Sequence, residues 1–74
     1  MNRNLNSAMP QLTKRELEII DCIARGLLSK QVAIELKISV RTVDAFRRTI
    51  LQKFHAKTMA EVIAILNNTA NSSI

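Results

Sequence analysis

The side chains able to do covalent or metal chemistry are few in this chain. It has one cysteine, Cys22, and one histidine, His55. No serine, cysteine or carboxylate stands at a spacing from His55 that is typical of a catalytic triad, and there is no glycine-rich phosphate loop. One cysteine and one histidine are too few ligands for a structural zinc ion. We therefore expect no enzymatic activity, metal, cofactor or small-molecule ligand, and we expect Cys22 to be a packing residue.

A stripe of hydrogen-bonding side chains indicates recognition chemistry instead. If residues 40–54 form a helix with about 100° per residue, its polar face carries Arg41, Asp44, Ala45, Arg48, Thr49 and Gln52. The opposite face is apolar apart from Arg47, and it carries Val40, Val43, Phe46, Ile50, Leu51 and Phe54. An α-helix fits the major groove of DNA, where arginines reach guanine edges or phosphates. A solvated amphipathic helix without a ligand is the alternative.

The distribution of charge favours a polyanionic partner. The 74 residues include eleven Lys or Arg and six Asp or Glu, for a net charge of +5. Residues 40–57 hold five Lys or Arg against one Asp, so their local charge is +4. Because the positive charge is concentrated in the segment with the polar face, we favour nucleic acid over a generally basic surface.

The length limits the architecture to one small domain. A chain of 74 residues buries only about 60% of its unfolded surface, which leaves little room for a cleft. No apolar run approaches the ~18 residues of a membrane span, and residues 1–9 do not resemble a signal peptide. We expect a cytoplasmic protein that does not enter the membrane.

Helix signals are confined to the middle of the chain. Residues 1–11 and 68–74 are polar and lack periodicity, so they are predicted to be flexible tails or linkers. Recurrent apolar spacing over residues 12–67 predicts an all-α domain. Its first helix begins after Thr13, which forms a capping box with Glu16, and ends at Gly26. The expected apolar face of this helix consists of Leu17, Ile20, Ile23, Ala24 and Leu27.

The next two helices are predicted to form a helix-turn-helix. The second runs from Lys30 to Lys37 and is capped by Ser29. Its inward-facing residues are expected to be Val32, Ala33 and Leu36. Ser39 then caps the third helix, residues 40–54. Helices joined by so short a segment must cross at a large angle.

The fourth helix is predicted from Thr58 to about Asn67. Thr58 and Glu61 repeat the capping-box spacing. The helix is apolar over more than one face, through Met59, Val62, Ile63, Ile65 and Leu66. This is more apolar surface than the last helix of a small domain needs, and the surplus is available to a partner.

A family resemblance is carried by residues at many fixed offsets between Leu12 and Leu66. They are Leu12, Thr13, Glu16, Glu18, Ile19, Ile20, Ile23, Ala24, Gly26, Lys30, Val32, Ala33, Leu36, Ile38, Ser39, Thr42, Val43, Arg47, Ile50, Lys53 and Phe54. With these residues the chain resembles the LuxR/FixJ (GerE-type) helix-turn-helix family. The resemblance implies a compact four-helix domain that binds double-stranded DNA as a bacterial transcription regulator.

The resemblance also implies roles for individual residues. The recognition helix, residues 40–54, would read bases through Asp44, Ala45 and Arg48. By the same matching, phosphate contacts would come from Ser29, Lys30, Arg41, Thr42, Arg47, Gln52 and Lys53. The helix over residues 58–67 would pair two copies as a homodimer on DNA, through Met59, Val62, Ile63 and Leu66. RNA polymerase is a further candidate partner.

Two departures from the usual family pattern bear on the parent protein. Phe46 stands where a histidine is usual, and we interpret it as core packing. Asp44 stands where many members carry lysine; a carboxylate repels phosphate but accepts a hydrogen bond from cytosine N4. An acid at this point is typical of the FixJ-like branch. We therefore favour the output domain of a two-component response regulator, or a stand-alone small regulator, over a quorum-sensing receptor.

Two other functions fit parts of the sequence. A helical interaction module would use the apolar fourth helix to bind a protein, but the basic third helix argues against it. The promoter-reading segment of a sigma factor has a similar helix-turn-helix and shares the positions before Gly26. The residues from Ile38 to Phe54 fit the LuxR/FixJ family better.

Overall fold

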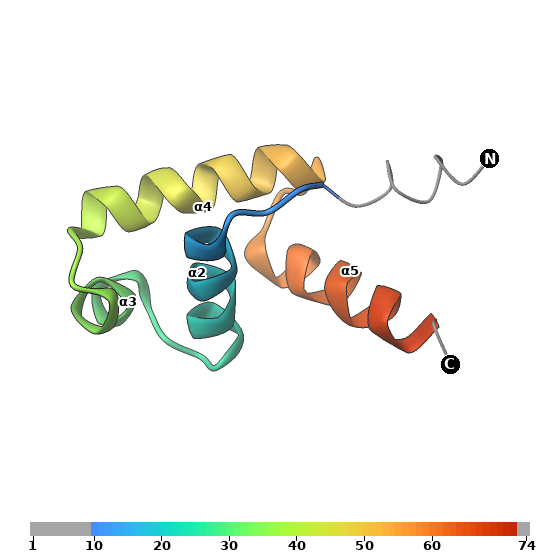
Figure 1. Cartoon of the computed structure of the whole chain (residues 1–74), viewed down its shortest axis with the longest axis horizontal. Helices are drawn as coiled ribbons and strands as arrows, with labels where there is room; N and C mark the ends of the chain where they lie inside the picture. The colour runs from blue at the N-terminus through green and yellow to red at the C-terminus, as the bar shows by residue number, and fades with distance from the viewer. Residues whose placement is uncertain (1–9, 73–74) are drawn as a thin grey trace.

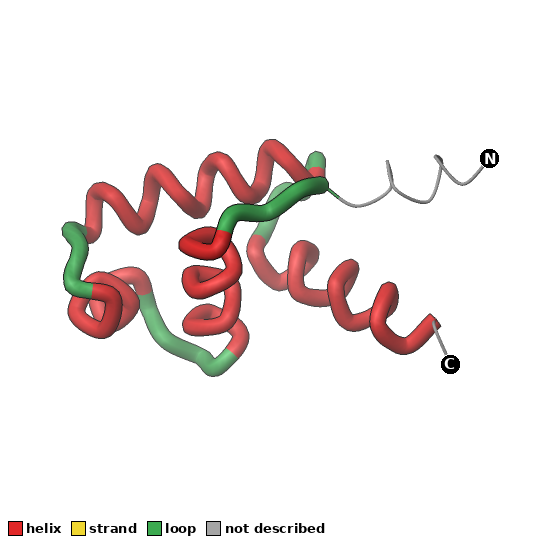
Figure 2. The backbone as a smooth tube through the Cα atoms, viewed as in Figure 1, coloured by secondary structure: helices red, strands yellow, loops and turns green. Residues whose placement is uncertain are grey.

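The computed structural model describes residues 10–72, and within them the chain folds into four helices and no strand (Figure 2). The helices are α2 (Lys14–Ala24), α3 (Ser29–Leu36), α4 (Val40–Phe54) and α5 (Met59–Ser72). The prediction of an all-α domain with four helices is confirmed. No helix of this described part is long and apolar enough to cross a membrane.

Helices α2 and α4 form the centre of the domain. Each of them contacts the other and also contacts both α3 and α5, whereas α3 and α5 do not meet within the described residues. Figure 1 shows α4 running along one side of the molecule, with α3 below its beginning and α5 leaving the other helices toward its own C-terminal end. The core between them consists of Ile19, Ile20, Cys22, Val32, Ala33, Val43, Ile50, Phe54, Met59 and Val62.

Helix α2 begins with the predicted capping box. The Glu16 amide donates to Thr13 Oγ1 (3.1 Å), and the Thr13 amide donates to Glu16 Oε1 (2.8 Å). Two amides without helical partners are thereby satisfied. The helix ends at Ala24, and Gly26 follows with a φ of +95°, a conformation that glycine adopts without a steric penalty. The predicted stop at Gly26 is confirmed.

The buried face of α2 differs from the predicted one. Leu17 is 50% exposed and Ala24 is also exposed, whereas Ile19 is fully buried and Cys22 is 1% exposed. The cause is the central position of α2, because α3, α4 and α5 all contact it. Contacts from three neighbours bury a wider arc than one apolar stripe, and that arc is rotated away from Leu17. Cys22 is a core residue, as expected.

Helix α3 begins one residue earlier than predicted and is capped differently. Leu28, not Ser29, is the N-cap residue, and Ser29 is the first residue of the helix. A leucine side chain has no hydrogen-bond acceptor, so only one of the two hydrogen bonds of a capping box is formed. In it the Leu28 amide donates to Gln31 Oε1 (2.8 Å). The helix ends at Leu36, and Lys37 adopts a left-handed conformation with φ 60°. The turn into α4 is therefore made without a glycine.

Helix α5 starts as predicted but is longer. The Glu61 amide donates to Thr58 Oγ1 (3.1 Å), while the Glu61 carboxylate accepts from the amide of Lys57 (2.8 Å) instead of that of Thr58. The helix continues beyond Asn67 to Ser72, so residues 68–72 belong to it and not to a tail. Residues 1–9 and 73–74 of the predicted tails lie outside the described residues, and residues 10–11 are not helical.

Candidate nucleic-acid interface

Helix α4 is held in the domain by one apolar face. Val43 and Ile50 are fully buried, and Phe54 is 9% exposed. At the start of the helix the Thr42 amide donates to Ser39 Oγ (3.0 Å). Ser39 is therefore the N-cap residue, as predicted. Val40 is an exception to the predicted apolar face, since it lies in the first turn and is 39% exposed. The rest of that face fixes the rotation of α4 about its axis.

The opposite face of α4 points to solvent over its whole length. All six residues predicted for this face are exposed: Arg41, Asp44, Ala45, Arg48, Thr49 and Gln52. Three of them were predicted to contact bases, namely Asp44, Ala45 and Arg48, and they lie within the first three turns of α4. The structure thus presents arginine, carboxylate and small side chains together on a rigid helix.

Helix α3 packs against α4 and completes the helix-turn-helix. The Ile38 amide donates to the Ala33 carbonyl (3.0 Å), which closes the end of α3 directly before Ser39 caps α4. At the other end of α3, Lys30 is exposed and Ser29 is half-buried. Thr42 is half-buried, and its hydroxyl lies 2.9 Å from Ser39 Oγ. Arg47 is half-buried, as its position toward the apolar face predicted.

Lys53 has a different environment from the other predicted phosphate contacts. Its Nζ donates to Glu16 Oε1 (2.8 Å) and to the Gln11 carbonyl (3.0 Å). Glu16 is the one buried charged residue among the described residues, at 3% exposed. Lys53 is therefore the counter-ion of a buried carboxylate and links α4 to the segment before α2. Sequence reasoning missed this pair because 37 positions separate its members.

The Glu16 carboxylate is stabilised in its charged form. Burial of the carboxyl raises its pKa, but hydrogen bonds from Lys53 and Thr13, together with the lysine charge, outweigh that effect, and the net pKa lies below the ordinary 4.5. The folded state therefore binds the Glu16 proton less tightly than the unfolded state does. The contribution of Glu16 to the free energy of unfolding is complete at pH values above its unfolded-state pKa, and it is lost as the pH falls through its lower folded-state pKa.

Denaturant unfolding curves measured at a series of pH values test the direction of this pH dependence. We expect the free energy of unfolding of the wild-type domain to decrease as pH is lowered from above 4.5 through the lower folded pKa of Glu16. Glu16→Gln should show a smaller decrease over the same interval, since its amide does not titrate. Identical pH profiles for the two proteins would contradict the assignment.

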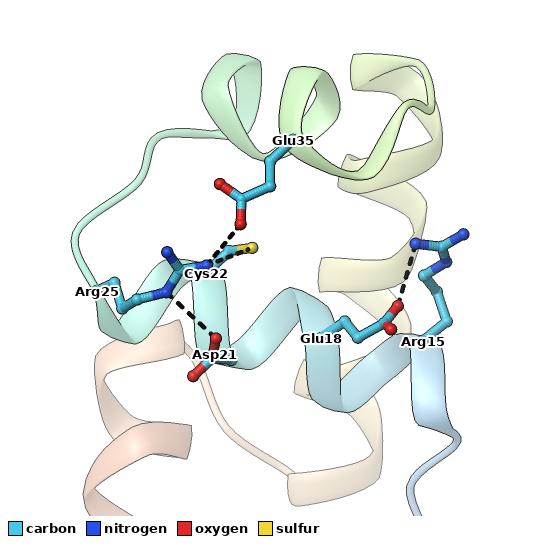
Figure 3. Close-up of polar contacts among 6 residues, drawn as sticks. All are labelled: Arg15, Glu18, Asp21, Cys22, Arg25 and Glu35. Atoms are coloured by element: carbon cyan, nitrogen blue, oxygen red, sulfur yellow. Dashed lines mark hydrogen bonds and ion pairs between the residues drawn. The ribbon is translucent and has the colours of Figure 1, made fainter.

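A second polar cluster joins α2 to α3 on the surface. Arg25 donates to Glu35 Oε2 (2.8 Å), to Asp21 Oδ2 (3.2 Å) and to Cys22 Sγ (3.4 Å), as Figure 3 shows. The pKa of Arg25 is raised, mainly by the hydrogen bond to Glu35. The same view shows the half-buried pair of Arg15 and Glu18 (3.1 Å) on α2. The four-residue spacing of Asp21 and Arg25 signals their pairing, whereas nothing local signals Glu35.

The residues predicted to pair two copies divide into two groups in α5. Met59 is 5% exposed and Val62 is fully buried, and both belong to the core of their own domain. Their assignment to a dimer surface stays a prediction, and within the single chain their side chains leave little area for a partner. Ile63 and Leu66 are half-buried and pack only partly against that core.

No group of three or more potential metal ligands occurs among the residues that the structure describes. His55 is exposed and adopts a left-handed conformation at the C-terminal end of α4 (φ 53°).

Comparison with known proteins identifies the family. The model for bacterial regulatory proteins, luxR family, matches residues 10–66. The oxygen regulatory protein NreC of Staphylococcus carnosus is 44% identical over 52 residues, which cover 70% of this chain and 24% of that protein. The transcriptional regulatory protein FixJ of Azorhizobium caulinodans is 35% identical over 52 residues, 70% of this chain and 25% of FixJ.

The tetrathionate response regulatory protein TtrR of Salmonella typhimurium is 36% identical over 53 residues, 72% of this chain and 26% of TtrR. The chain thus spans about a quarter of the length of the curated relatives it matches. The family match covers more than half of the chain and includes all of α2, α3 and α4. The chain therefore belongs to the luxR family of bacterial regulatory proteins, a family of helix-turn-helix transcription regulators.

Proposed function

We propose that this domain binds double-stranded DNA with sequence specificity and that α4 enters the major groove. The observation that carries the proposal is the two-sided character of α4. One side is anchored by buried Val43 and Ile50, and the other presents a fully exposed polar face in the most basic segment of the chain. A helix fixed in this way can place the same side chains against base edges each time it docks.

The contacts divide by chemistry. Arg48 is proposed to donate two hydrogen bonds to a guanine, and Asp44 to accept one from cytosine N4; the exposure of both side chains on α4 supports these roles. Ala45 lies between them and permits close approach. Phosphate contacts at the edges of the groove come from Ser29, Lys30, Arg41, Thr42, Arg47 and Gln52, which supply affinity through counterion release. Lys53 is proposed to contribute indirectly, because its ion pair with Glu16 positions the C-terminal end of α4.

Two copies are proposed to bind a palindromic site and to meet through α5. With Met59 and Val62 buried in the domain, the pairing surface is formed by Ile63 and Leu66. Half-buried apolar side chains of this kind lose their remaining water contact when a second copy covers them. The two recognition helices would then read half-sites one helical turn apart.

The regulatory setting follows from the relatives. One of the three relatives is called a response regulatory protein, and the others are regulatory proteins for oxygen and for transcription. We infer that this domain is the output part of a cytoplasmic two-component response regulator, acting on transcription with RNA polymerase as its eventual target. The acid at Asp44 supports this branch of the family.

Selection from random DNA tests the function directly. The purified domain is mixed with a pool of random duplexes at two salt concentrations, and the retained DNA is sequenced. We expect enrichment of a motif with two related half-sites. Retention without a motif, lost steeply as salt rises, would reduce the function to phosphate attraction. No retention at low salt would favour a protein-interaction module.

The substitution Arg48→Ala separates base reading from phosphate attraction. At the selected site the loss should be about 1 to 3 kcal/mol, and on random DNA it should be much smaller. Arg15→Ala is the matched control, since it removes the same charge and breaks only a half-buried ion pair on α2. An equal loss on both DNAs, measured by fluorescence anisotropy, would show that Arg48 contacts only phosphate.

A further inference from the structure

An apolar hollow lies along one edge of the exposed face of α4. The hollow is open to solvent, has a volume of about 290 Å³, and is lined by Thr42, Ala45, Phe46 and Thr49. Ala45, Phe46 and Thr49 lie three, four and seven positions after Thr42, so the four residues form a single stripe along the helix. Asp44 and Arg48 are exposed on the same helix, both on the side of the stripe away from the core.

The wall of the hollow is mainly carbon, although two of its residues carry hydroxyls. The Thr49 hydroxyl donates to the Ala45 carbonyl (3.1 Å), and the Thr42 hydroxyl lies 2.9 Å from Ser39 Oγ. Both hydroxyls therefore have partners within or directly before α4. What the threonines leave for a ligand is largely their methyl groups, beside the Ala45 methyl and the Phe46 ring. The small side chain of Ala45 produces the depression between its larger neighbours.

The major-groove edges of DNA offer one hydrocarbon group that fits such a surface. Guanine, cytosine and adenine present only hydrogen-bonding atoms there, whereas thymine presents its C5-methyl group. We propose that the hollow receives the C5-methyl group of a thymine, which makes Thr42, Ala45, Phe46 and Thr49 determinants of base specificity. The proposal rests on the proposed entry of α4 into the major groove.

The position of the thymine relative to the other bases follows from the helix geometry. Ala45 and Arg48 are separated by about 4.5 Å along the helix axis, close to the ~3.4 Å between successive bases on a strand. The thymine is therefore expected next to the base read by Arg48 or one position beyond it. Arg41 and Arg48 are exposed beside the stripe, both on the side away from the core, and two arginines match a polyanion better than an apolar protein segment.

Removal of a single methyl group, first from the DNA and then from the protein, tests the contact. In the DNA obtained by the random selection, each thymine is replaced in turn by deoxyuridine, which removes only the methyl group. We expect about a fourfold weaker affinity at one thymine of each half-site, the effect of one buried methyl, and no comparable loss at the other thymines. Thr49→Ser removes one methyl of the hollow and keeps the hydroxyl, so the deoxyuridine penalty should shrink in that variant.

The control is Thr58→Ser, which makes the same chemical change at a helix cap, where serine serves as well as threonine. It should retain the full fourfold penalty. Deoxyuridine tolerated at every position of a selected motif would overturn the thymine proposal and leave the proposed function intact. A full penalty in Thr49→Ser would place the methyl contact elsewhere and overturn the assignment to this hollow. If no motif is selected at all, the proposed function fails and the thymine proposal fails with it.

Discussion

Replacement of Ile50 by alanine is expected to lower the free energy of unfolding by about 3 to 4 kcal/mol. Ile50 is fully buried and belongs to the core that holds α4 against the rest of the domain. The lost burial of its side chain and the cavity left behind both contribute. Because small domains have only about 5 to 15 kcal/mol in total, such a loss lowers the midpoint of thermal unfolding by more than 10 °C.

Ile34→Ala is the matched control for this prediction. It removes the same atoms, but Ile34 is 75% exposed on α3. We expect a change within about 0.5 kcal/mol. Circular dichroism at 222 nm during thermal and denaturant unfolding measures both variants. Similar losses in the two proteins would show that Ile34 is covered in solution or that Ile50 is not part of the core.

The second large effect is expected from Glu16→Ala, at about 2 to 4 kcal/mol of the free energy of unfolding. The substitution removes the acceptor of the Thr13 amide and takes the carboxylate away from the Lys53 ammonium, which keeps its hydrogen bond to the Gln11 carbonyl. The Lys53 side chain is 30% exposed, so water moderates the loss. Glu18→Ala, which breaks a surface pair with Arg15, should cost no more than about 1 kcal/mol.

The same pair decides how Lys53 contributes to DNA binding. Lys53→Met should reduce stability as Glu16→Ala does. At a temperature where the variant stays folded, the dependence of log affinity on log salt should keep its wild-type slope, because the lysine neutralises Glu16 and not a phosphate. A slope smaller by about one would show a direct phosphate contact and would return Lys53 to that role.

Most of the secondary structure could be predicted because it depends on neighbours within one turn. The capping box at Thr13, the stop at Gly26 and the cap at Ser39 involve atoms three or four residues apart. The exposure of all six polar positions on α4 likewise follows from one strong period in a single helix. These features needed no knowledge of what packs against them.

The remaining features depend on which helices meet. For the first helix the periodicity predicted one apolar face that includes Leu17, whereas contacts from three neighbouring helices bury Ile19 and leave Leu17 exposed. In α5, apolar residues on several faces gave no basis for separating core from partner surface, and packing buried Met59 and Val62.

By itself the sequence determined the four helices, the helix-turn-helix, the basic polar face of α4 and the family, because local hydrogen bonds, periodicity and charge are properties of short segments. Only the tertiary structure decided that Lys53 neutralises Glu16, that Arg25 joins α2 to α3 through Glu35, and that Thr42 and Thr49 border one apolar hollow. Those features depend on distances between residues that are far apart in the sequence or on successive turns of a helix. Burial then determines which charges must pair and which methyl groups remain accessible.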